Sequence, residues 1–168
     1  MTRPTRSIHK LTHIDRDDMP VMVDVGSKPI TTRKAVARAR VHINAALATA
    51  IRVNGIRKGR VLEVARLAGI QAAKKTADLI PLCHPVPLDN IEVHVALQGR
   101  NVEIEATAEA TWKTGVEMEA LTAATVAALT VYDMGKALDR AIRIDAVQLT
   151  AKTGGTHGEY RLHRRKTA

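Results

Sequence analysis

Aromatic residues are almost absent from this 168-residue chain, which has no phenylalanine, one tryptophan and two tyrosines. Proteins that hold single-stranded nucleic acid by stacking its bases need such side chains, so this mode of binding is disfavoured. The core must instead be built from alanine, valine, leucine, isoleucine and methionine. Hydrophobic residues make up 45% of the chain, which is enough for one globular domain with a real core.

Cysteine is also scarce, because Cys83 is the only one. A single thiol excludes an internal disulfide and a metal cluster held by several cysteines. The chain contains no apolar run near the roughly 20 residues of a membrane span. The first residues are polar and charged, unlike a secretory signal. Together these absences predict a cytoplasmic protein that does not enter membranes.

The common phosphate-binding loops are missing too, because neither GxxxxGK[ST] nor GxGxxG occurs in the chain. This removes the usual signals for a mononucleotide or dinucleotide site. His9 and His13 have an i, i+4 spacing, but no third ligand lies near them, so no metal site is predicted. Any anion would have to be held by another arrangement.

Positive charge is in excess, with 26 lysines and arginines against 17 acidic residues and a net charge of +9. Residues 161–168 hold four bases and no acid, and we interpret them as a basic C-terminal tail. Residues 1–20 show no periodicity and predict a flexible N-terminal arm. The domain itself would span residues 21–160, and its smaller excess of positive charge suits an anionic ligand.

Hydrophobic periodicity predicts the secondary structure of this domain. Alternation with a period of two predicts strands over 33–43, 90–98, 101–110 and 141–152. The alanines of the first of these segments also permit a helix. Spacings of three and four residues predict helices over 45–53, 60–80 and 115–140. This order predicts a ferredoxin-like α+β fold, in which helices pack on one face of an antiparallel sheet.

Two loops between these elements carry side chains that suit chemistry. His84 lies in the loop after Pro81 and directly before Pro85, where its imidazole could transfer a proton, although a structural role is also common. The glycine-rich segment 152–158 reads either as a flexible turn or as a loop that brings Lys152 and backbone amides against an anion.

The helix predicted over 115–140 carries charged residues at both ends. Asp133 and Lys136 are three residues apart, so their side chains share a face as an ion pair or as an acid–base couple. Glu117 and Glu119 stand in the first turn, where the helix dipole already favours acids. Apolar residues surround most of this helix, which predicts deep burial or burial against another subunit.

Several lysines fall near the ends of the predicted elements, where the fold could bring them together. They are Lys58, Lys74, Lys75, Lys113, Lys136 and Lys152. A triphosphate needs several such cations to neutralise its charge. A nucleic-acid-binding module would also explain the charge, but it leaves the carboxylates of Asp133, Glu117 and Glu119 unexplained. A protein that binds a nucleoside triphosphate without converting it is a second alternative.

Four long motifs make a more specific prediction. They are MVDVGSK (22–28), ARLAGIQAAKKTADLIPLCHP (65–85), KTGVEMEALTAATVAALTVYDMGKA (113–137) and AKTGGTHGEY (151–160). In these motifs the chain resembles the molybdenum cofactor biosynthesis protein C family, the cyclic pyranopterin monophosphate synthases. The resemblance implies a lyase that converts 3′,8-cyclo-7,8-dihydroguanosine 5′-triphosphate into cyclic pyranopterin monophosphate and pyrophosphate. It also implies that no redox cofactor is needed, although Mg²⁺ can accompany the triphosphate.

The resemblance further implies a set of site residues. The expected catalytic residues are Lys58, Asp133 and Lys136, with a lysine pKa lowered by neighbouring cations and burial. The expected substrate-binding residues are Arg33, Leu82, Cys83, His84, Lys113, Glu117, Met118, Glu119 and Lys152. Finally, the family implies a homohexamer, a trimer of dimers with sites at a dimer interface, and a small-molecule triphosphate as substrate.

Overall fold

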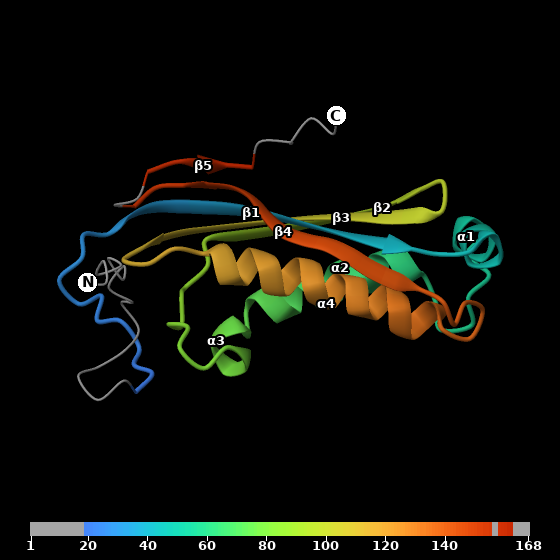
Figure 1. Cartoon of the computed structure of the whole chain (residues 1–168), viewed down its shortest axis with the longest axis horizontal. Coiled ribbons are helices and arrows are strands. Elements are labelled where there is room, and N and C mark those ends of the chain that lie inside the picture. Colours follow the sequence, from blue (N-terminus) through green and yellow to red (C-terminus); the bar gives the residue numbers. More distant parts are fainter. Residues whose placement is uncertain (1–18, 156–157, 163–168) are drawn as a thin grey trace, which may run out of the picture.

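The computed structural model describes residues 19–155 and 158–162 of the chain (Figure 1). Its elements are β1 (Thr31–His42), α1 (Ala45–Arg52), α2 (Val61–Ala73), α3 (Thr76–Leu79), β2 (Asn90–Gln98), β3 (Asn101–Trp112), α4 (Glu117–Gly135), β4 (Arg143–Thr153) and β5 (Tyr160–Arg161). The predicted arm lies outside the described residues except for Met19 and Pro20. The basic tail is described only at Arg161 and Leu162, so the boundaries of both remain predictions.

The strands form one antiparallel sheet in the order β2-β3-β1-β4-β5. Without the short β5, this is the strand order of a ferredoxin-like βαββαβ fold. Both α2 and α4 lie on the same face of the sheet, while α1 lies at one end (Figure 1). The structure therefore confirms the predicted fold class.

Alternation along β1 shows why this segment is a strand and not a helix. Ala35, Ala37 and Ala39 face the helices and are fully or almost fully buried. Basic residues on the opposite face of β1 point outward and pair with glutamates of β3. These pairs are Lys34–Glu109, Arg38–Glu105 and Arg40–Glu103, each with an N–O distance of 2.6 Å. The pairs are exposed and each contributes little, but they fit the register of the two strands.

Small residues let the helical layer approach this sheet closely. Where α4 crosses the sheet, its buried face is built largely from alanines. Gly69 of α2 lies so close to the backbone of α4 that a β-carbon would be 2.9 Å from the carbonyl oxygen of Ala123. A core without phenylalanine is thus packed through close backbone approach instead of through large side chains.

The predicted helix over 60–80 is interrupted, and this part of the prediction is wrong. A turn at Lys74 and Lys75 separates α2 from α3, and the amide of Lys75 bonds the Ala72 carbonyl at 3.0 Å. Buried Thr76 fixes the turn, because its hydroxyl donates to the carbonyl of Ala73 at 3.0 Å. The turn directs the following loop toward the first residues of α4 (Figure 1).

The predicted helix over 115–140 is shorter than expected and ends at Gly135. Asp139 fixes the turn after it, because its carboxylate accepts from the amides of Asn44 (2.6 Å) and Ala141 (2.9 Å). The side chain of Asn44 caps α1, accepting from the amide of Leu47 at 2.8 Å. None of the described helices is long and apolar enough to cross a membrane.

Candidate active site

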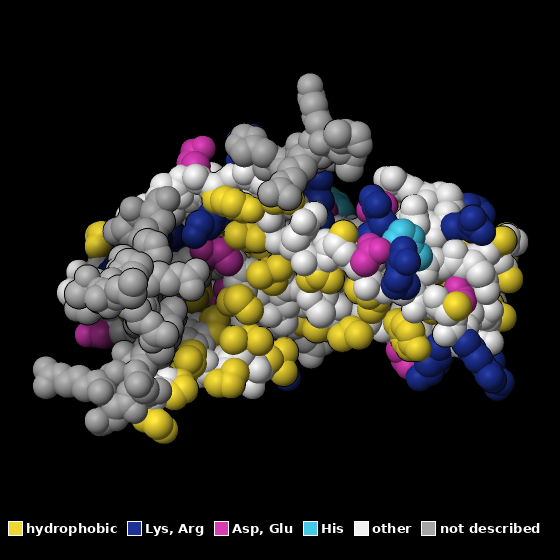
Figure 2. Space-filling view, in the orientation of Figure 1, with side chains coloured by type: hydrophobic (Ala, Val, Ile, Leu, Met, Phe, Trp, Pro, Cys, Tyr) yellow, Lys and Arg dark blue, Asp and Glu magenta, His cyan; other side chains and the backbone are white. Residues whose placement is uncertain are grey.

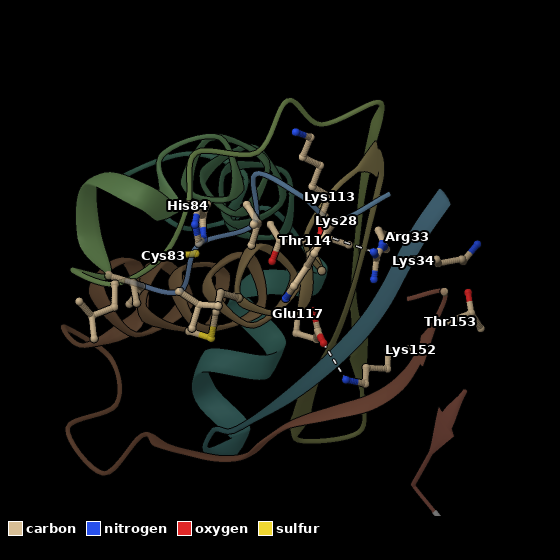
Figure 3. A pocket seen from close by; sticks show the side chains of 18 residues that line it. Lys28, Arg33, Lys34, Cys83, His84, Lys113, Thr114, Glu117, Lys152 and Thr153 are labelled. Carbon is tan, nitrogen blue, oxygen red and sulfur yellow. Dashed lines mark hydrogen bonds and ion pairs between the residues drawn. The ribbon is translucent and has the colours of Figure 1, made fainter. Parts of the chain in front are cut away.

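A pocket of about 700 Å³ lies where α4 begins, at one end of the sheet (Figure 3). Five segments form its walls: the stretch before β1, the start of β1, the loop around residue 83, the turn before α4 with the first residues of α4, and the end of β4. Most of the predicted substrate-binding residues line it. These are Arg33, Leu82, Cys83, His84, Lys113, Glu117, Met118 and Lys152.

The pocket carries more positive than negative charge. Its cationic side chains are Lys28, Arg33, Lys34, Lys113 and Lys152, and Glu117 is its one lining carboxylate among the described residues. Lys34 is already paired with Glu109, outside the pocket. Sequence reasoning missed Lys28 and Lys34, although Lys28 ends the MVDVGSK motif, which was a usable signal. A concave site of this charge is suited to a multiply charged anion.

Arg33 presents hydrogen-bond donors to this pocket. Its Nη2 is 3.5 Å from the Lys113 carbonyl, while its Nε is buried and has no partner in the described part of the chain. Buried donors are rarely left unpaired in folded proteins. A phosphate oxygen is an acceptor of the right chemistry for this guanidinium.

The glycine-rich loop packs against the same arginine. Gly154 and Gly155 have φ angles of 87° and 86°, which favour glycine. The backbone of Gly154 contacts the Thr32 carbonyl, and that of Gly155 contacts the Arg33 guanidinium. Lys152, just before them, lines the pocket, which supports the anion-loop interpretation over a plain turn. Thr156 and His157 of the motif lie outside the described residues.

Glu117 and Lys152 form an ion pair within the pocket, with Oε1 and Nζ 2.9 Å apart (Figure 3). The carboxylate of Glu117 folds back over Gly115, in space that a β-carbon on residue 115 would fill. In the free protein, Glu117 therefore neutralises the lysine of the glycine-rich loop. A phosphate group could replace this carboxylate as the partner of Lys152.

Glu119 lies beneath the pocket and does not line it, with only 2% of its surface exposed. One oxygen, Oε1, is 3.9 Å from the Cys83 sulfur, and the other, Oε2, has no partner in the described part of the chain. Burial raises the pKa of the Glu119 carboxyl, and the nearby Glu117 raises it further. Burial and the neighbouring Glu119 raise the pKa of the Cys83 thiol to about 11.

Lys58, Asp133 and Lys136 form a second cluster, apart from the pocket. Asp133 Oδ2 is 2.7 Å from Lys58 Nζ, and Asp133 Oδ1 is 2.8 Å from Lys136 Nζ. Hydrogen bonds from Lys136 and then Lys58 lower the pKa of Asp133 to about 2, and Asp133 raises the pKa of Lys136. A lowered pKa was expected for a lysine here. That expectation is wrong for Lys136 in the single chain, because its partner is an anion.

The two groups of predicted site residues do not meet within one chain. Glu117 and Asp133 stand at opposite ends of α4, which at 1.5 Å per residue places them about 24 Å apart along the axis. Neither Asp133 nor the two lysines that pair with it line the pocket. One chain thus holds two half-sites, one cationic and concave, the other an exposed acid–base cluster.

Apolar side chains are exposed on the helical side of the molecule. Figure 2 shows hydrophobic side chains gathered over the helical layer. Among the exposed large ones are Leu67 of α2, Leu129 and Tyr132 of α4, and Leu138 after α4. Of the two predictions for α4, complete burial within the single chain is not found, since Leu129 is 52% exposed, and burial against another subunit stays a prediction. Such a surface on a small protein is typical of an interface between subunits.

No group of three or more metal-binding side chains occurs in the part of the chain that the structure describes. His9 and His13 lie outside the described residues. The polar side chains of the pocket are mostly lysine and arginine, which donate hydrogen bonds and repel cations. The charge of these described pocket residues thus suits an anion better than a cation.

A ferredoxin-like fold with a cationic pocket beside α4 suits a protein that binds a small, negatively charged molecule. Comparison with known proteins makes the assignment more specific: residues 22–155 match the MoaC family, and the chain belongs to that family. This confirms the resemblance seen in the four sequence motifs.

Several curated relatives carry the name cyclic pyranopterin monophosphate synthase. The protein of that name from Parvibaculum lavamentivorans is 53% identical over 154 residues, which cover 90% of this chain and 96% of the relative. The one from Thermomicrobium roseum is 54% identical, covering 90% of this chain and 93% of the relative. That from a Nostoc species is 49% identical, with 89% and 90% covered.

Proposed function

We propose that this chain is a cyclic pyranopterin monophosphate synthase, a lyase of molybdenum cofactor biosynthesis. Its substrate is 3′,8-cyclo-7,8-dihydroguanosine 5′-triphosphate, and its products are cyclic pyranopterin monophosphate and pyrophosphate. The observation that carries the proposal is the cationic pocket, because residues of all four family motifs line it. Relatives about half identical to the chain bear the same name.

The pocket would hold the triphosphate. Arg33 has a buried Nε without a described partner, and Lys152 can exchange the Glu117 carboxylate for a phosphate oxygen. His84 lies on the opposite wall and would orient the purine-derived ring or hydrogen-bond a phosphate. Pyrophosphate is already a good leaving group, so these cations would act mainly by electrostatic stabilisation.

Lys58, Asp133 and Lys136 would carry the proton transfers of ring opening, ring closure and attack on the α-phosphate. In the free chain Asp133 is ionised and Lys136 holds its proton firmly, because each stabilises the charge of the other. A substrate that displaces either lysine from Asp133 would free an ammonium as an acid and a carboxylate as a base. Replacement of Lys58 or Lys136 by alanine should abolish turnover while the fold remains intact.

The half-sites would be joined by assembly, since they lie about 24 Å apart along one α4. We infer a homohexamer, a trimer of dimers, in which the pocket of one subunit faces the Lys58–Asp133–Lys136 cluster of another. The exposed apolar side chains on α2 and α4 support burial against a second subunit. A monodisperse monomer in solution would contradict this arrangement.

The proposed reaction consists of proton transfers and phosphoryl substitution, so it requires no redox cofactor. Mg²⁺ could accompany the triphosphate, bound by its phosphate oxygens. The expected compartment is the cytoplasm. Nucleic acid is not an expected partner, because the carboxylates of Glu117 and Asp133 would oppose a polyanion.

The test couples this protein to the radical enzyme that makes the cyclised GTP intermediate. Pyrophosphate is assayed directly, and the pterin is measured by fluorescence after oxidation. The proposal predicts that both products appear in equal amounts. If the intermediate binds but persists, the protein is a binder without this activity.

The shared site is tested by mixing two inactive variants, Lys136→Ala and Lys152→Ala, under conditions that allow subunits to exchange. A mixed dimer would pair the intact pocket of one variant with the intact acid–base cluster of the other. Random exchange should then restore about a quarter of the wild-type activity. Each variant mixed with wild-type protein serves as the control for exchange. If activity stays at zero although exchange is complete, both half-sites must act within one chain.

A further inference from the structure

The segment just before β1 forms one wall of the pocket. Val23, Val25 and Lys28 line the cavity, although this segment has no helix or strand of its own. A tight turn shapes it: the amide of Gly26 donates to Asp24 Oδ1 at 2.7 Å, and that of Lys28 donates to the Val25 carbonyl at 3.1 Å. Its place against the pocket must therefore be fixed by contacts from elsewhere.

One such contact comes from Lys113, which directly follows β3. Its Nζ donates a hydrogen bond of 2.7 Å to the carbonyl of Gly26, which lies 87 residues away in the sequence. In Figure 3 the Lys113 side chain points away from Glu117, while that of Lys28 points toward it. Although Lys113 borders the pocket, its ammonium thus bonds the wall segment and not the middle of the cavity.

Lys28 differs from the other pocket lysines in the partners of its ammonium group. Lys34 is paired with Glu109, and Lys152 is paired with Glu117. In contrast, no described carboxylate forms an ion pair with Lys28, Arg33 or Lys113. Of these three, Lys113 has its ammonium bonded to the Gly26 carbonyl. Lys28 and Arg33 thus remain as cations without a described carboxylate partner whose charge an anionic ligand would neutralise, whereas the Lys113 ammonium is held by the wall segment.

We infer that Lys28 is a ligand of the substrate's triphosphate and that Lys113 is a positioning residue, which acts by holding Gly26 and with it Lys28. This revises the expectation that Lys113 itself binds substrate. The inference rests on the proposed function only for the identity of the ligand, because any polyphosphate should engage the same ammonium groups. It assigns a binding role to residues 23–28, the wall segment that precedes β1.

The test is a double-mutant cycle with inorganic tripolyphosphate as the probe, measured by titration calorimetry on the full chain. Lys28→Met should weaken binding about tenfold, the typical loss for one charge-assisted hydrogen bond. Lys28→Arg should restore most of it. If Lys113 acts through Lys28, then Lys113→Met should also weaken binding, and the double variant should bind no more weakly than Lys28→Met. Arg66→Met, which removes an exposed charge outside the pocket, controls for net charge.

A second readout separates positioning from direct contact. Amide hydrogen exchange of residues 23–28 should become faster in Lys113→Met and stay unchanged in Lys28→Met, because only the first loses the bond to Gly26. The positioning role of Lys113 would be overturned by either of two results. One is that the losses of tripolyphosphate affinity multiply in the double variant. The other is that amide hydrogen exchange of residues 23–28 is unchanged in Lys113→Met. Wild-type affinity in Lys28→Met would overturn the ligand role.

The outcome is independent of the turnover assay. If wild-type protein fails to convert the cyclised GTP intermediate but the cycle behaves as described, the proposed reaction is wrong and the anion-binding inference stands. If turnover is normal and Lys28→Met binds tripolyphosphate as wild type does, the inference fails and the proposed function is unaffected.

Discussion

The backbone of Gly155 lies against the guanidinium group of Arg33, in space that a β-carbon on residue 155 would fill. Arg33 stands on β1, whereas the glycine follows β4, the strand paired with β1. The glycine-rich loop thus determines where the arginine of the pocket can lie. A glycine is needed at position 155 for two reasons: a β-carbon would collide with the guanidinium, and the φ of 86° is one that other residues rarely adopt.

Replacement of Gly155 by alanine should therefore impair binding beyond its effect on stability. The new methyl group must displace the Arg33 guanidinium, so we expect about a tenfold weaker affinity for tripolyphosphate. A matched control is Gly158→Ala, because Gly158 also has a positive φ of 68° but nothing within 4 Å of its β-carbon position. Both variants should lose about 1 kcal/mol of stability from the left-handed backbone. Equal affinities in the two variants would contradict the role given to Gly155.

The acid–base cluster can be tested through the pKa of Asp133. Its neighbours lower that pKa to about 2, with Lys136 the larger influence and Lys58 the smaller. Lys136→Met should therefore raise the pKa of Asp133 toward its ordinary value by more than Lys58→Met does. Carbon-13 NMR of labelled aspartate between pH 1.5 and 6 measures this directly. A pKa that neither variant changes would show that these ion pairs do not persist in solution.

The sign of the corresponding stability effect follows from the same shift. A folded-state pKa below the unfolded value means that the ionised carboxylate of Asp133 favours the folded state. This contribution is present above the unfolded value of 3.8 and is lost as the pH falls toward about 2. Both lysines are about half exposed, so solvent screens the effect.

Periodicity in the sequence predicted the sheet and its helical layer well, since each long element buries one face. The spacing of Ala35, Ala37 and Ala39 at every second position, among mostly basic residues, is a local signal that needs no tertiary information. The turn between α2 and α3 was missed because its cause is the burial of Thr76. The two-residue strand β5 is too short to show a period.

The site could be predicted only where its residues are close in sequence or belong to a family motif. The i, i+3 spacing of Asp133 and Lys136 predicted their contact, which is 2.8 Å long. The contact of Lys58 with Asp133 spans 75 residues, and that of Lys113 with Gly26 spans 87. The fold brings partners so far apart together, so these contacts cannot be predicted from the spacing of residues in the sequence.

Helix packing offers a test of the small-residue core. A methyl group on Gly69 would lie 2.9 Å from the Ala123 carbonyl oxygen, 3.2 Å from Val93 Cγ1 and 3.3 Å from Ala127 Cβ. Gly69→Ala gains about 1 kcal/mol of helix propensity but should lose about 1–3 kcal/mol to overpacking. Chemical denaturation should thus show a net loss of stability. Exposed Gln71→Ala in the same helix is the control, and a stabilised Gly69→Ala would show that α2 and α4 separate easily.

Glu119 provides a prediction about pH. Burial raises its pKa above the ordinary value of 4.5, so the folded protein favours the protonated carboxyl. The folded state gains this advantage fully below pH 4.5 and loses it as the pH rises through the higher folded-state pKa. Ionisation of Glu119 therefore costs the folded state stability as the pH rises, because its buried Oε2 has no described partner.

A neutral side chain of the same shape should remove this cost. Relative to wild type, the melting temperature of Glu119→Gln should rise as the pH increases from 4 to 8, because only the wild-type side chain ionises over that range. Glu117→Gln is the matched control, since Glu117 is more exposed and paired with Lys152, and its removal should destabilise the fold slightly at neutral pH. A difference between Glu119→Gln and wild type that does not vary with pH would mean that Glu119 titrates normally. A difference that rises with pH would show that the pKa of Glu119 is raised in the folded protein.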